Sequence, residues 1–410
     1  MFLAKYWTEA GTDVDIFLYE SNDELISSVV RDLRGSGVQI FKVEHRFRVL
    51  LGRWRSNKVA QLMRRALLVR TRSKMVVMWN RLFYLSLRIA PARTLFPANI
   101  CDIVAEQAKA NKYVAIIGVE KGGVSWAGMV AERTGTPIIY YSLELYTWGH
   151  HYVRQSLIMR SLKRLEVKNH RNCAITIVQD SVRAAALIAD NSVSKAMPIV
   201  LLPVSADGPS FTETSNWLQK KFGFGTDDIV IISLGQISLN RGNGDLVEAA
   251  QRFPREWHLV FHGYGPANII DALERRDEKK CISLSMDLVK INVLPEIIAS
   301  ADIGLAFYDR FTENDRLTGF ASEKIAMYLQ CGVPVIAGRL KTYEHIEDCR
   351  AGILIDEIEE LPIAISKIIG EYEEYRRNAF ECYERYYRMD KNAMAAIDAI
   401  SKLLQTNGAR

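Results

Sequence analysis

Short, uninterrupted apolar runs alternate with helical stretches along most of this chain, and this alternation restricts its fold more than any other feature. Runs that stay apolar at every position are typical of parallel strands, which have helices on both faces. The alternation pauses at a segment rich in turn formers, Pro203–Ser215, and then restarts, so it predicts two doubly wound α/β domains. The candidate strands are Val114–Val119, Ile138–Ser142, Ala174–Val178, Ile199–Leu202, Ile229–Leu234, His258–Phe261, Ile303–Phe307, Pro334–Ala337 and Ile353–Ile355.

A length of 410 residues also fits two ordinary domains. The sequence after Pro362 mixes aromatic and charged residues at helical spacing, which predicts a C-terminal helical cap. The predicted parts are an N-terminal domain, 1–205, a linker, 206–226, a C-terminal domain, 227–390, and a C-terminal helix, 391–410.

The N-terminal domain begins in an unusual way. Leu3–Ala10 has the pattern of a helix and Val14–Tyr19 that of the strand after it. A doubly wound domain normally starts with a strand and a glycine-rich turn before its first helix, and both are missing. We therefore expect either a natural chain longer than this one or a sheet edge that residues 45–95 cover.

Nothing in the sequence directs the chain out of the cytoplasm. No apolar stretch reaches the roughly 18–20 residues that a spanning helix needs, and Lys5 and Glu9 interrupt the place of a signal peptide's apolar core. The six cysteines are scattered singly, which argues for reduced thiols and against a disulfide framework or a zinc site. The expected location is cytoplasmic.

The charge is unevenly distributed. Between His45 and Ile100 there are 13 basic residues and no Asp or Glu, although the whole chain has a net charge of only +5. Aromatic and aliphatic residues are interleaved with the cations, a pattern suited to an anionic membrane surface. This basic amphipathic insertion, about 45–95, predicts peripheral contact with the inner face of the membrane. A basic helix pair that packs on its own domain is the alternative; nucleic acid is disfavoured because no nucleic-acid-binding motif accompanies the charge.

The first candidate site follows the strand Ile229–Leu234. A polar loop bounded by Gly235 and Gly242 leads into a helix, and such loops at the carboxyl ends of parallel strands bind ligands. Arg241 lies just before the helix N-terminus, where backbone N–H groups favour anions. An arginine that simply extends into solvent is the alternative.

The second candidate site is the segment 318–336. A loop of small residues leads into a helix that Gly332 ends, and Pro334 then opens a buried strand. Ser322 is a plausible N-cap. The amides of residues 320–323 would point at a diphosphate, which Lys324 could neutralise. An ordinary capped helix is the alternative.

Together these segments resemble the C-terminal domain of retaining GT-B glycosyltransferases of the group 1, or family 4, type. The match covers most of residues 227–390 and is looser in the N-terminal half. The matching stretches are Ser233–Ala250, His258–Pro266, Leu294–Phe307, Ala321–Ala337 and Arg350–Ile355.

The resemblance implies GT-B architecture, in which two Rossmann-like domains face a cleft. It implies transfer of a sugar from a nucleotide-diphosphate donor to a glycan or polyprenyl-linked acceptor, with retention, in cell-surface polysaccharide biosynthesis. No cofactor and no metal is expected. The implied catalytic residues are Glu144 on the acceptor side and Arg241 and Lys324 at the leaving diphosphate. The implied donor-binding residues are Gly235, Gln236, Gly263, Gly319, Phe320, Ala321, Ser322, Glu323 and Met327.

The chain departs from the family at its charged positions. Family members hold the pyrophosphate with an Arg–Lys pair, and here those positions are Gln236 and Arg241. They also carry two glutamates eight positions apart, and here those positions are Gly319 and Met327. A thioether is at best a weak acceptor for ribose hydroxyls. These losses leave an alternative function open: a non-catalytic GT-B-like module that binds a partner or glycan.

Other motifs are less informative. Asp13-Val14-Asp15 has the DxD form of metal-dependent glycosyltransferases but opens a strand, which is the wrong context. Glu120 and Lys121 follow a predicted strand and are either functional or ordinary surface residues. His150-His151 has no partner at ligand spacing and is interpreted as structural. Gly263-Tyr264-Gly265 lacks the third glycine of a nicotinamide-binding fingerprint.

Overall fold

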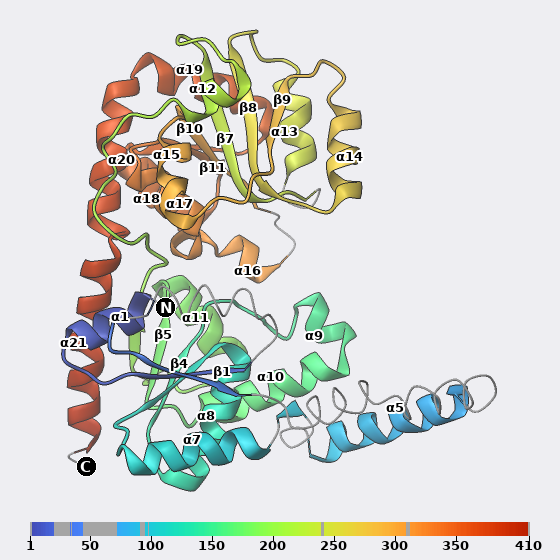
Figure 1. Cartoon of the computed structure of the whole chain (residues 1–410), viewed down its shortest axis with the longest axis vertical. Helices are drawn as coiled ribbons and strands as arrows, with labels where there is room; N and C mark the ends of the chain where they lie inside the picture. The colour runs from blue at the N-terminus through green and yellow to red at the C-terminus, as the bar shows by residue number, and fades with distance from the viewer. Residues whose placement is uncertain are drawn as a thin grey trace. The chain divides into compact units, whose positions relative to one another are not determined.

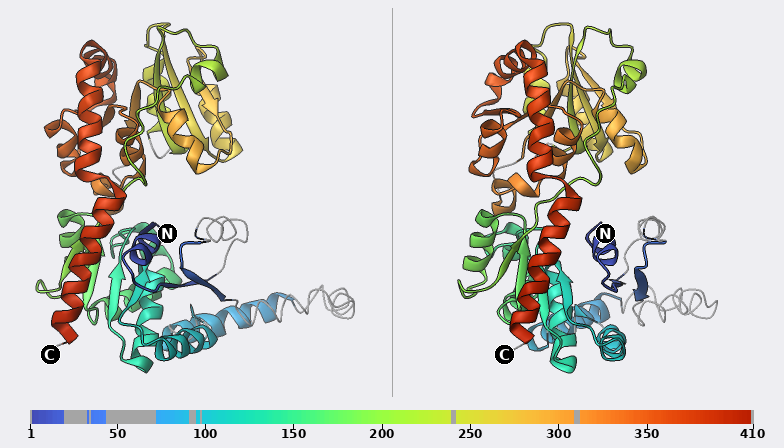
Figure 2. Two further views of the ribbon diagram at one scale, coloured as in Figure 1. Left: turned by 60° about the vertical axis from the view of Figure 1, so that its left-hand side comes forward. Right: turned by 90° about the vertical axis from the view of Figure 1, so that its left-hand side faces the viewer.

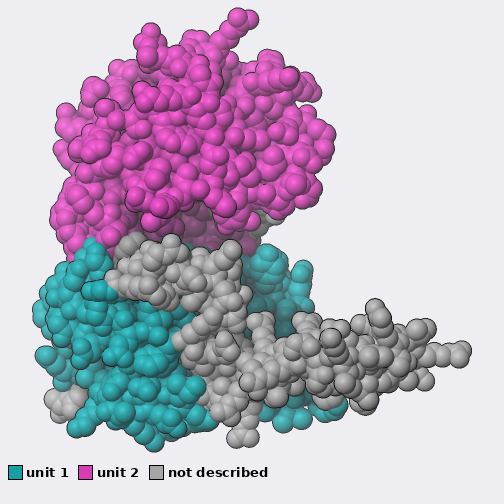
Figure 3. Space-filling model, in the orientation of Figure 1, with its two compact units in different colours: residues 1–201, 393–410 teal, residues 202–392 magenta. Residues whose placement is uncertain are grey.

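The computed structural model describes residues 2–19, 33, 35–43, 72–90, 95–96, 98–238, 242–308 and 312–408. The chain divides into two compact units (Figure 3). Unit 1 comprises residues 1–201 and 393–410, and unit 2 comprises residues 202–392. Each is built on a parallel sheet with helices, which confirms the predicted α/β fold class.

Unit 2 is built on a six-stranded sheet with the order β12-β11-β10-β7-β8-β9, and every neighbouring pair is parallel (Figure 1). Five of its strands coincide with predicted apolar runs. The prediction missed β9 because its sequence, ISLS, alternates polar and apolar residues and is mostly half-buried. The strands are β7 (Ile229–Gln236), β8 (Trp257–Tyr264), β9 (Ile282–Ser285), β10 (Ile303–Ala306), β11 (Val335–Gly338) and β12 (Gly352–Ile355).

Helices cover both faces of this sheet. Side chains of α13, α14 and α19 form one core with it, and those of α12, α15, α17, α18 and α20 form the other. The helices are α12 (Trp217–Phe222), α13 (Asn243–Ala250), α14 (Ala267–Arg276), α15 (Leu294–Ile298), α16 (Glu313–Arg316), α17 (Glu323–Gln330), α18 (Glu344–Asp348), α19 (Leu361–Gly370) and α20 (Tyr372–Tyr386). Short 3₁₀ turns are η2 (Ile291–Val293), η3 (Gly319–Ala321), η4 (Lys341–Tyr343) and η5 (Ile358–Glu360).

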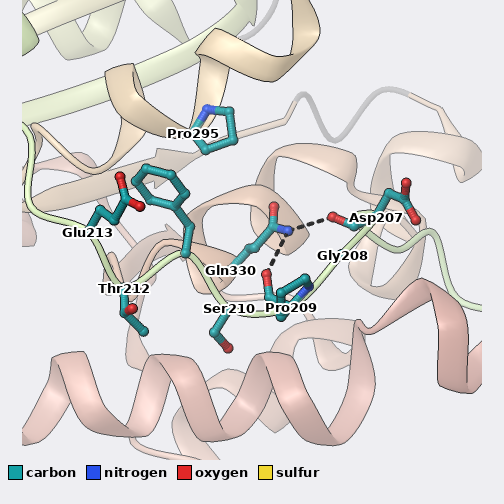
Figure 4. Close-up of a pocket in the computed structure, with 9 residues that line it drawn as sticks. Asp207, Gly208, Pro209, Ser210, Thr212, Glu213, Pro295 and Gln330 are labelled. Atoms are coloured by element: carbon teal, nitrogen blue, oxygen red, sulfur yellow. Dashed lines mark hydrogen bonds between the residues drawn. The ribbon is translucent and has the colours of Figure 1, made fainter. Parts of the chain in front are cut away.

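The segment that was predicted as a linker packs into unit 2. The Gln330 side-chain amide donates to the carbonyl oxygens of Asp207 (2.7 Å) and Pro209 (3.2 Å), beside a shallow pocket (Figure 4). The Tyr383 hydroxyl donates to the Gly208 carbonyl at 2.6 Å, and Leu218 is fully buried. Residues 206–226 therefore belong to the fold of unit 2.

Unit 1 contains a four-stranded parallel sheet in the order β3-β4-β5-β6. All four strands coincide with predicted runs. The elements are β3 (Ile116–Val119), β4 (Ile138–Tyr141), β5 (Ile175–Val178), β6 (Ile199–Leu201), α7 (Ala98–Ala110), α8 (Glu120–Thr134), α9 (His151–Gln155), α10 (Leu157–His170) and α11 (Ser181–Asp190).

The beginning of unit 1 forms a separate two-stranded parallel sheet. After α1 (Phe2–Glu9), β1 (Asp15–Tyr19) pairs with β2 (Gln39–Val43) and not with the four-stranded sheet. Asn111 and Tyr113 donate hydrogen bonds to Asp15, and Phe17 packs against the α7–α8 core. Among the described residues, no strand before β3 joins the four-stranded sheet. Most of residues 45–95, predicted to cover its edge, lie outside the described residues.

Two helices complete unit 1. The C-terminal helix α21 (Met389–Gly408, red in Figure 2) buries Ala393, Ala396 and Ile400. Helix α5 (Arg72–Ile89) extends away from the four-stranded sheet (Figure 2). Within the described part of the chain, no helix combines the length and the apolar character needed to cross a membrane.

Candidate functional site

The strand order of unit 2 reverses between β7 and β10, and in open α/β sheets the ligand-binding crevice lies outside the carboxyl ends of the strands at such a point. The last ladder pair of β7 and β10 is Ser233 with Leu305, after which the strands separate. Tyr328 of α17 fills the gap: its buried hydroxyl accepts from the Leu234 N–H at 2.9 Å and lies 3.2 Å from the Leu305 carbonyl oxygen. Helix α17 is thereby anchored at the place where open α/β sheets bind ligands.

The predicted loop after β7 lies at this crevice. Gly235 has a φ of +100°, which favours glycine, and a Cβ on Gly263 would lie 1.9 Å from the Gly235 carbonyl oxygen. A Cβ on Gly242 would lie 3.8 Å from that of Phe307, which follows β10. Gly242, which precedes α13, therefore lies beside the residue that follows β10. Gln236 is exposed at the end of β7, whereas Arg241 lies outside the described residues.

The second predicted loop is packed against η4. Gly319 is buried, and its N–H donates to the Thr342 hydroxyl at 3.3 Å. A Cβ at this position would lie 2.1 Å from the Thr342 carbonyl oxygen, so no side chain fits. The neighbouring Thr318 hydroxyl pairs with that of Tyr343 at 2.5 Å. Position 319 is where the family that the chain resembles carries its first glutamate, and here it has no room for a side chain.

Phe320 points into an aromatic cluster. Its ring stacks on His345 at 4.2 Å and lies 5.6 Å from Tyr387, while its carbonyl accepts from the Val204 N–H. The His345 Nε2 and the Tyr387 hydroxyl are 2.6 Å apart. Burial lowers the pKa of His345 to about 4, so the imidazole is neutral at pH 7. The Phe320 side chain thus fastens the loop to the unit 2 core.

The start of α17 is tied to β10. Ser322 occupies the N-cap position as predicted, but its hydroxyl bonds to the Tyr308 hydroxyl at 2.7 Å and makes no capping hydrogen bond. The Lys324 amino group lies 4.8 Å from the centre of the Tyr308 ring. Glu323 is exposed, and Met327 packs against the core.

The amides of the loop divide into two sets. Those of Ala321 and Ser322 donate to the carbonyl oxygens of Thr318 (2.7 Å) and Gly319 (3.4 Å) within the turn. The first turn of α17 begins at Glu323, after this turn, and the N–H groups of a first helical turn point along the helix axis away from the helix.

The remaining predicted residues lie in unit 1. Glu144 is exposed in the loop after β4, and Glu120 opens α8 directly after β3. His150 caps α9, since its Nδ1 accepts from the Tyr152 N–H, which agrees with a structural role. No three His, Cys, Asp or Glu side chains of the described residues are grouped to hold a metal ion.

The structure thus brings Gly235, Gln236, Gly263 and the 319–327 segment to one edge of one sheet, and keeps Glu144 in the other unit. Sequence reasoning missed Tyr308, Tyr328 and Thr342. Tyr328 lies four residues after Lys324 on the same helix, and only that spacing hinted at a shared role.

The family model for glycosyl transferases group 1 matches residues 228–371, and a comparison with curated proteins found no match. The fold resembles HepE of Anabaena, solved with UDP, with a TM-score of 0.66 and 13% identity over 98% of this chain and 95% of that one. It resembles sucrose-phosphate synthase of Thermosynechococcus elongatus with a TM-score of 0.59 and 16% identity, over 78% and 80%. It also resembles a trehalose-phosphate synthase of Burkholderia vietnamiensis with a TM-score of 0.55 and 11% identity, over 76% and 77%.

The match to HepE covers 98% of this chain and so includes both of its units. The segment that matches the family model contains the whole six-stranded sheet of unit 2. Residues 228–371 thus match the group 1 glycosyl transferase family model, and the chain has the GT-B fold.

Proposed function

We propose that this chain is a glycosyltransferase that takes a sugar from a nucleotide-diphosphate donor held by unit 2. One observation supports the proposal: the Tyr328 hydroxyl ties α17 to the end of β7, and Tyr308, which follows β10, contacts Ser322 and Lys324 at the start of that helix. The structure of HepE contains UDP, and others of the same protein contain UDP-glucose or UDP with glucose. A uridine diphosphate sugar is therefore the donor to test first.

The proposed chemistry stabilises the leaving diphosphate. Negative charge develops on it as the glycosidic bond breaks, and the helix N-terminus and Lys324 supply positive potential aimed at that charge. Arg241 would add the second cation from the loop after β7. Since these groups supply the positive charge, we expect transfer to continue when EDTA removes divalent metals.

The acceptor side belongs to unit 1 in this proposal. Glu144 would orient the acceptor hydroxyl, and transfer would retain the anomeric configuration, as the resembling family does. A lipid-linked glycan in surface polysaccharide synthesis is the acceptor class that suits a chain held at a membrane.

Helix α5 supports such a membrane contact. Its described side chains include five exposed apolar residues next to two exposed arginines, Arg81 and Arg88. The apolar residues are Leu82, Phe83, Tyr84, Leu85 and Ile89. We expect the protein to co-sediment with anionic vesicles at low salt and to be released as salt rises, because screening shortens to about 8 Å at physiological ionic strength. Binding that ignores both salt and lipid charge would remove this part of the proposal.

The decisive test is titration of UDP and GDP into wild type and Lys324→Ala, followed by a transfer assay. A charged hydrogen bond is worth about 1.5–3 kcal/mol, so Lys324→Ala and Arg241→Ala should each lower kcat/KM roughly 10–150-fold. Lys367→Ala, an exposed lysine on α19, is the matched control. A wild type that binds neither nucleotide would contradict the donor site.

A non-catalytic GT-B-like binding module is the second candidate. The closed position at Gly319 and the core-packed Met327 favour it, because neither place offers a carboxylate. Nucleotide binding without transfer to any glycan acceptor would support this candidate over the enzyme.

A further inference from the structure

Glu120 has a backbone conformation that its position does not explain. Five non-glycine residues of the described part of the chain have positive φ. Four of them, Lys112, Ser192, Lys280 and Arg350, lie in turns that follow helices, where left-handed conformations commonly end a helix. Glu120, with φ +61°, instead opens α8 directly after β3. Strain of this kind persists only where the surrounding contacts enforce it, and it often marks functional positions.

The strained backbone directs the Glu120 side chain at the loop after β4. Its Oε1 accepts two backbone hydrogen bonds, from the N–H of Leu143 at 2.7 Å and from that of Glu144 at 2.8 Å. Burial raises the pKa of Glu120, and these two N–H groups oppose that shift. One carboxylate oxygen therefore holds two consecutive peptide groups of this loop.

Two more buried side chains hold the same loop from other elements. Gln179, which follows β5, donates through Nε2 to the Ser142 carbonyl at 2.7 Å. Arg183 of α11 donates to the Leu143 carbonyl at 2.7 Å. Each of these two side chains is 1% exposed.

The remaining groups of the loop are also paired. The Ser142 N–H donates to the Ile177 carbonyl at 3.0 Å, and the Ser142 hydroxyl lies 3.4 Å from the Glu144 carbonyl oxygen. Every backbone N–H and C=O of residues 142–144 thus has a protein partner, although Glu144 itself is exposed. Loop backbones at a surface usually bond to water, and burying charged side chains to replace that water is costly. The arrangement immobilises the loop that carries Glu144.

We propose that Glu120 is a positioning residue that, with Gln179 and Arg183, presets the 142–144 loop so that Glu144 meets an acceptor hydroxyl in a fixed place. The proposal rests on the transferase function proposed above. A preset loop avoids the cost of ordering the group at the moment of reaction. Lys121 holds the next part of the loop, since its amino group lies 3.3 Å from the centre of the Tyr146 ring.

Three variants test this. Glu120→Gly removes the carboxylate and accepts the positive φ without strain, so it should fold. Glu120→Gln keeps an oxygen that can accept both N–H groups. Glu132→Gln, an exposed residue on the same helix that pairs with Lys168, is the matched control.

The first measurement is amide hydrogen exchange of residues 142–146 in the full chain, which needs no activity. We expect exchange at Leu143 and Glu144 to be at least tenfold faster in Glu120→Gly and close to wild type in Glu120→Gln and Glu132→Gln. Exchange in Glu120→Gly at the wild-type rate would overturn the proposal.

The second measurement is transfer kinetics. Glu120→Gly should lower kcat at least tenfold without changing the affinity for UDP, and Glu120→Gln should restore most of it. Equal kcat in Glu120→Gly and wild type would overturn the positioning role and leave the transferase intact. A wild type without transfer would instead refute the proposed function, and hydrogen exchange alone would then decide whether Glu120 fixes the loop.

Discussion

The two candidate loops, 142–144 in unit 1 and 318–322 in unit 2, are fixed by different combinations of contacts. Buried polar side chains from three elements hold the first by its peptide groups. Aromatic packing and hydroxyl pairs hold the second: Phe320 lies in the His345 cluster, and Ser322 is tied to Tyr308.

The difference has a physical consequence. Hydrogen bonds fix direction and are lost when one partner is removed, whereas packing fixes position by excluding volume. The loop in unit 1 should therefore be sensitive to the loss of a polar atom. The loop in unit 2 should be sensitive to added atoms, because Gly319 has no room for a side chain.

The strongest test of this contrast is Gly319→Glu, which places a glutamate where the family that the chain resembles carries one. It forces a charged side chain against the Thr342 carbonyl oxygen, so we expect a loss of at least about 3 kcal/mol in unfolding free energy and loss of UDP binding. Thermal melting and nucleotide titration measure both. Gly370→Ala, where a Cβ meets nothing within 4 Å, is the control and should melt like wild type. Wild-type stability in Gly319→Glu would show that the loop is not closed by packing.

Acid should weaken each unit through at least one buried histidine. Burial lowers the pKa of His170 and of His345 from 6.5 to about 4. Asn191 donates to the His170 Nδ1, so Nε2 carries the proton and pairs with Thr176. Between pH 6.5 and pH 4 the unfolded chain binds more protons at these histidines than the folded chain does. The free energy of unfolding is therefore highest above pH 6.5 and falls as the pH drops toward 4.

When the pH is lowered from 7 to 5, each histidine should reduce the free energy of unfolding by roughly 2 kcal/mol. Urea unfolding at the two pH values measures this. His345→Gln should remove part of the pH dependence and loosen the Phe320 loop, whereas His170→Gln should remove its part without affecting nucleotide binding. An identical pH dependence in all three proteins would refute the assignment.

Removing one oxygen at the crevice should have a smaller effect. Tyr328→Phe leaves the buried Leu234 N–H without its partner, which should cost about 1–3 kcal/mol and weaken UDP binding as α17 loses its anchor. Urea unfolding gives the first quantity and nucleotide titration the second. Tyr264→Phe, on an exposed ring at the end of β8, should leave stability unchanged. A Tyr328→Phe protein as stable as wild type would mean that water replaces the hydroxyl.

The smallest effect is expected for Met327→Glu. Met327 is half-buried at the surface of the core, so a glutamate can reach solvent, and UDP should bind at least as tightly as to wild type. Met327→Gln has the same length without the charge and is the control. Weaker UDP binding in the glutamate variant alone would show that the ribose does not approach this face of α17.

The sequence by itself determined the two α/β units, nearly every strand and the sheet edge at which the unit 2 site lies. Apolar runs and helical spacing are local signals, and the carboxyl ends of parallel strands meet at one edge whatever the details of packing. Gly235, Gly263 and Lys324 could therefore be assigned to one place from their order along the chain. Strand β9 was not predicted because its alternating sequence is a weak strand signal. The separate β1–β2 sheet was not predicted because the pairing of two strands distant in sequence leaves no local pattern.

Only the tertiary structure decided how each loop is held. Tyr328 reaches Leu234 across 94 positions, Glu120 reaches Leu143 across 23, and Thr342 closes the space at Gly319 from another turn. The spacing of residues along the sequence does not predict such contacts, because they depend on which segments the completed sheets bring together. The sequence could name the two candidate loops, and the packing around them decided which of their atoms are accessible.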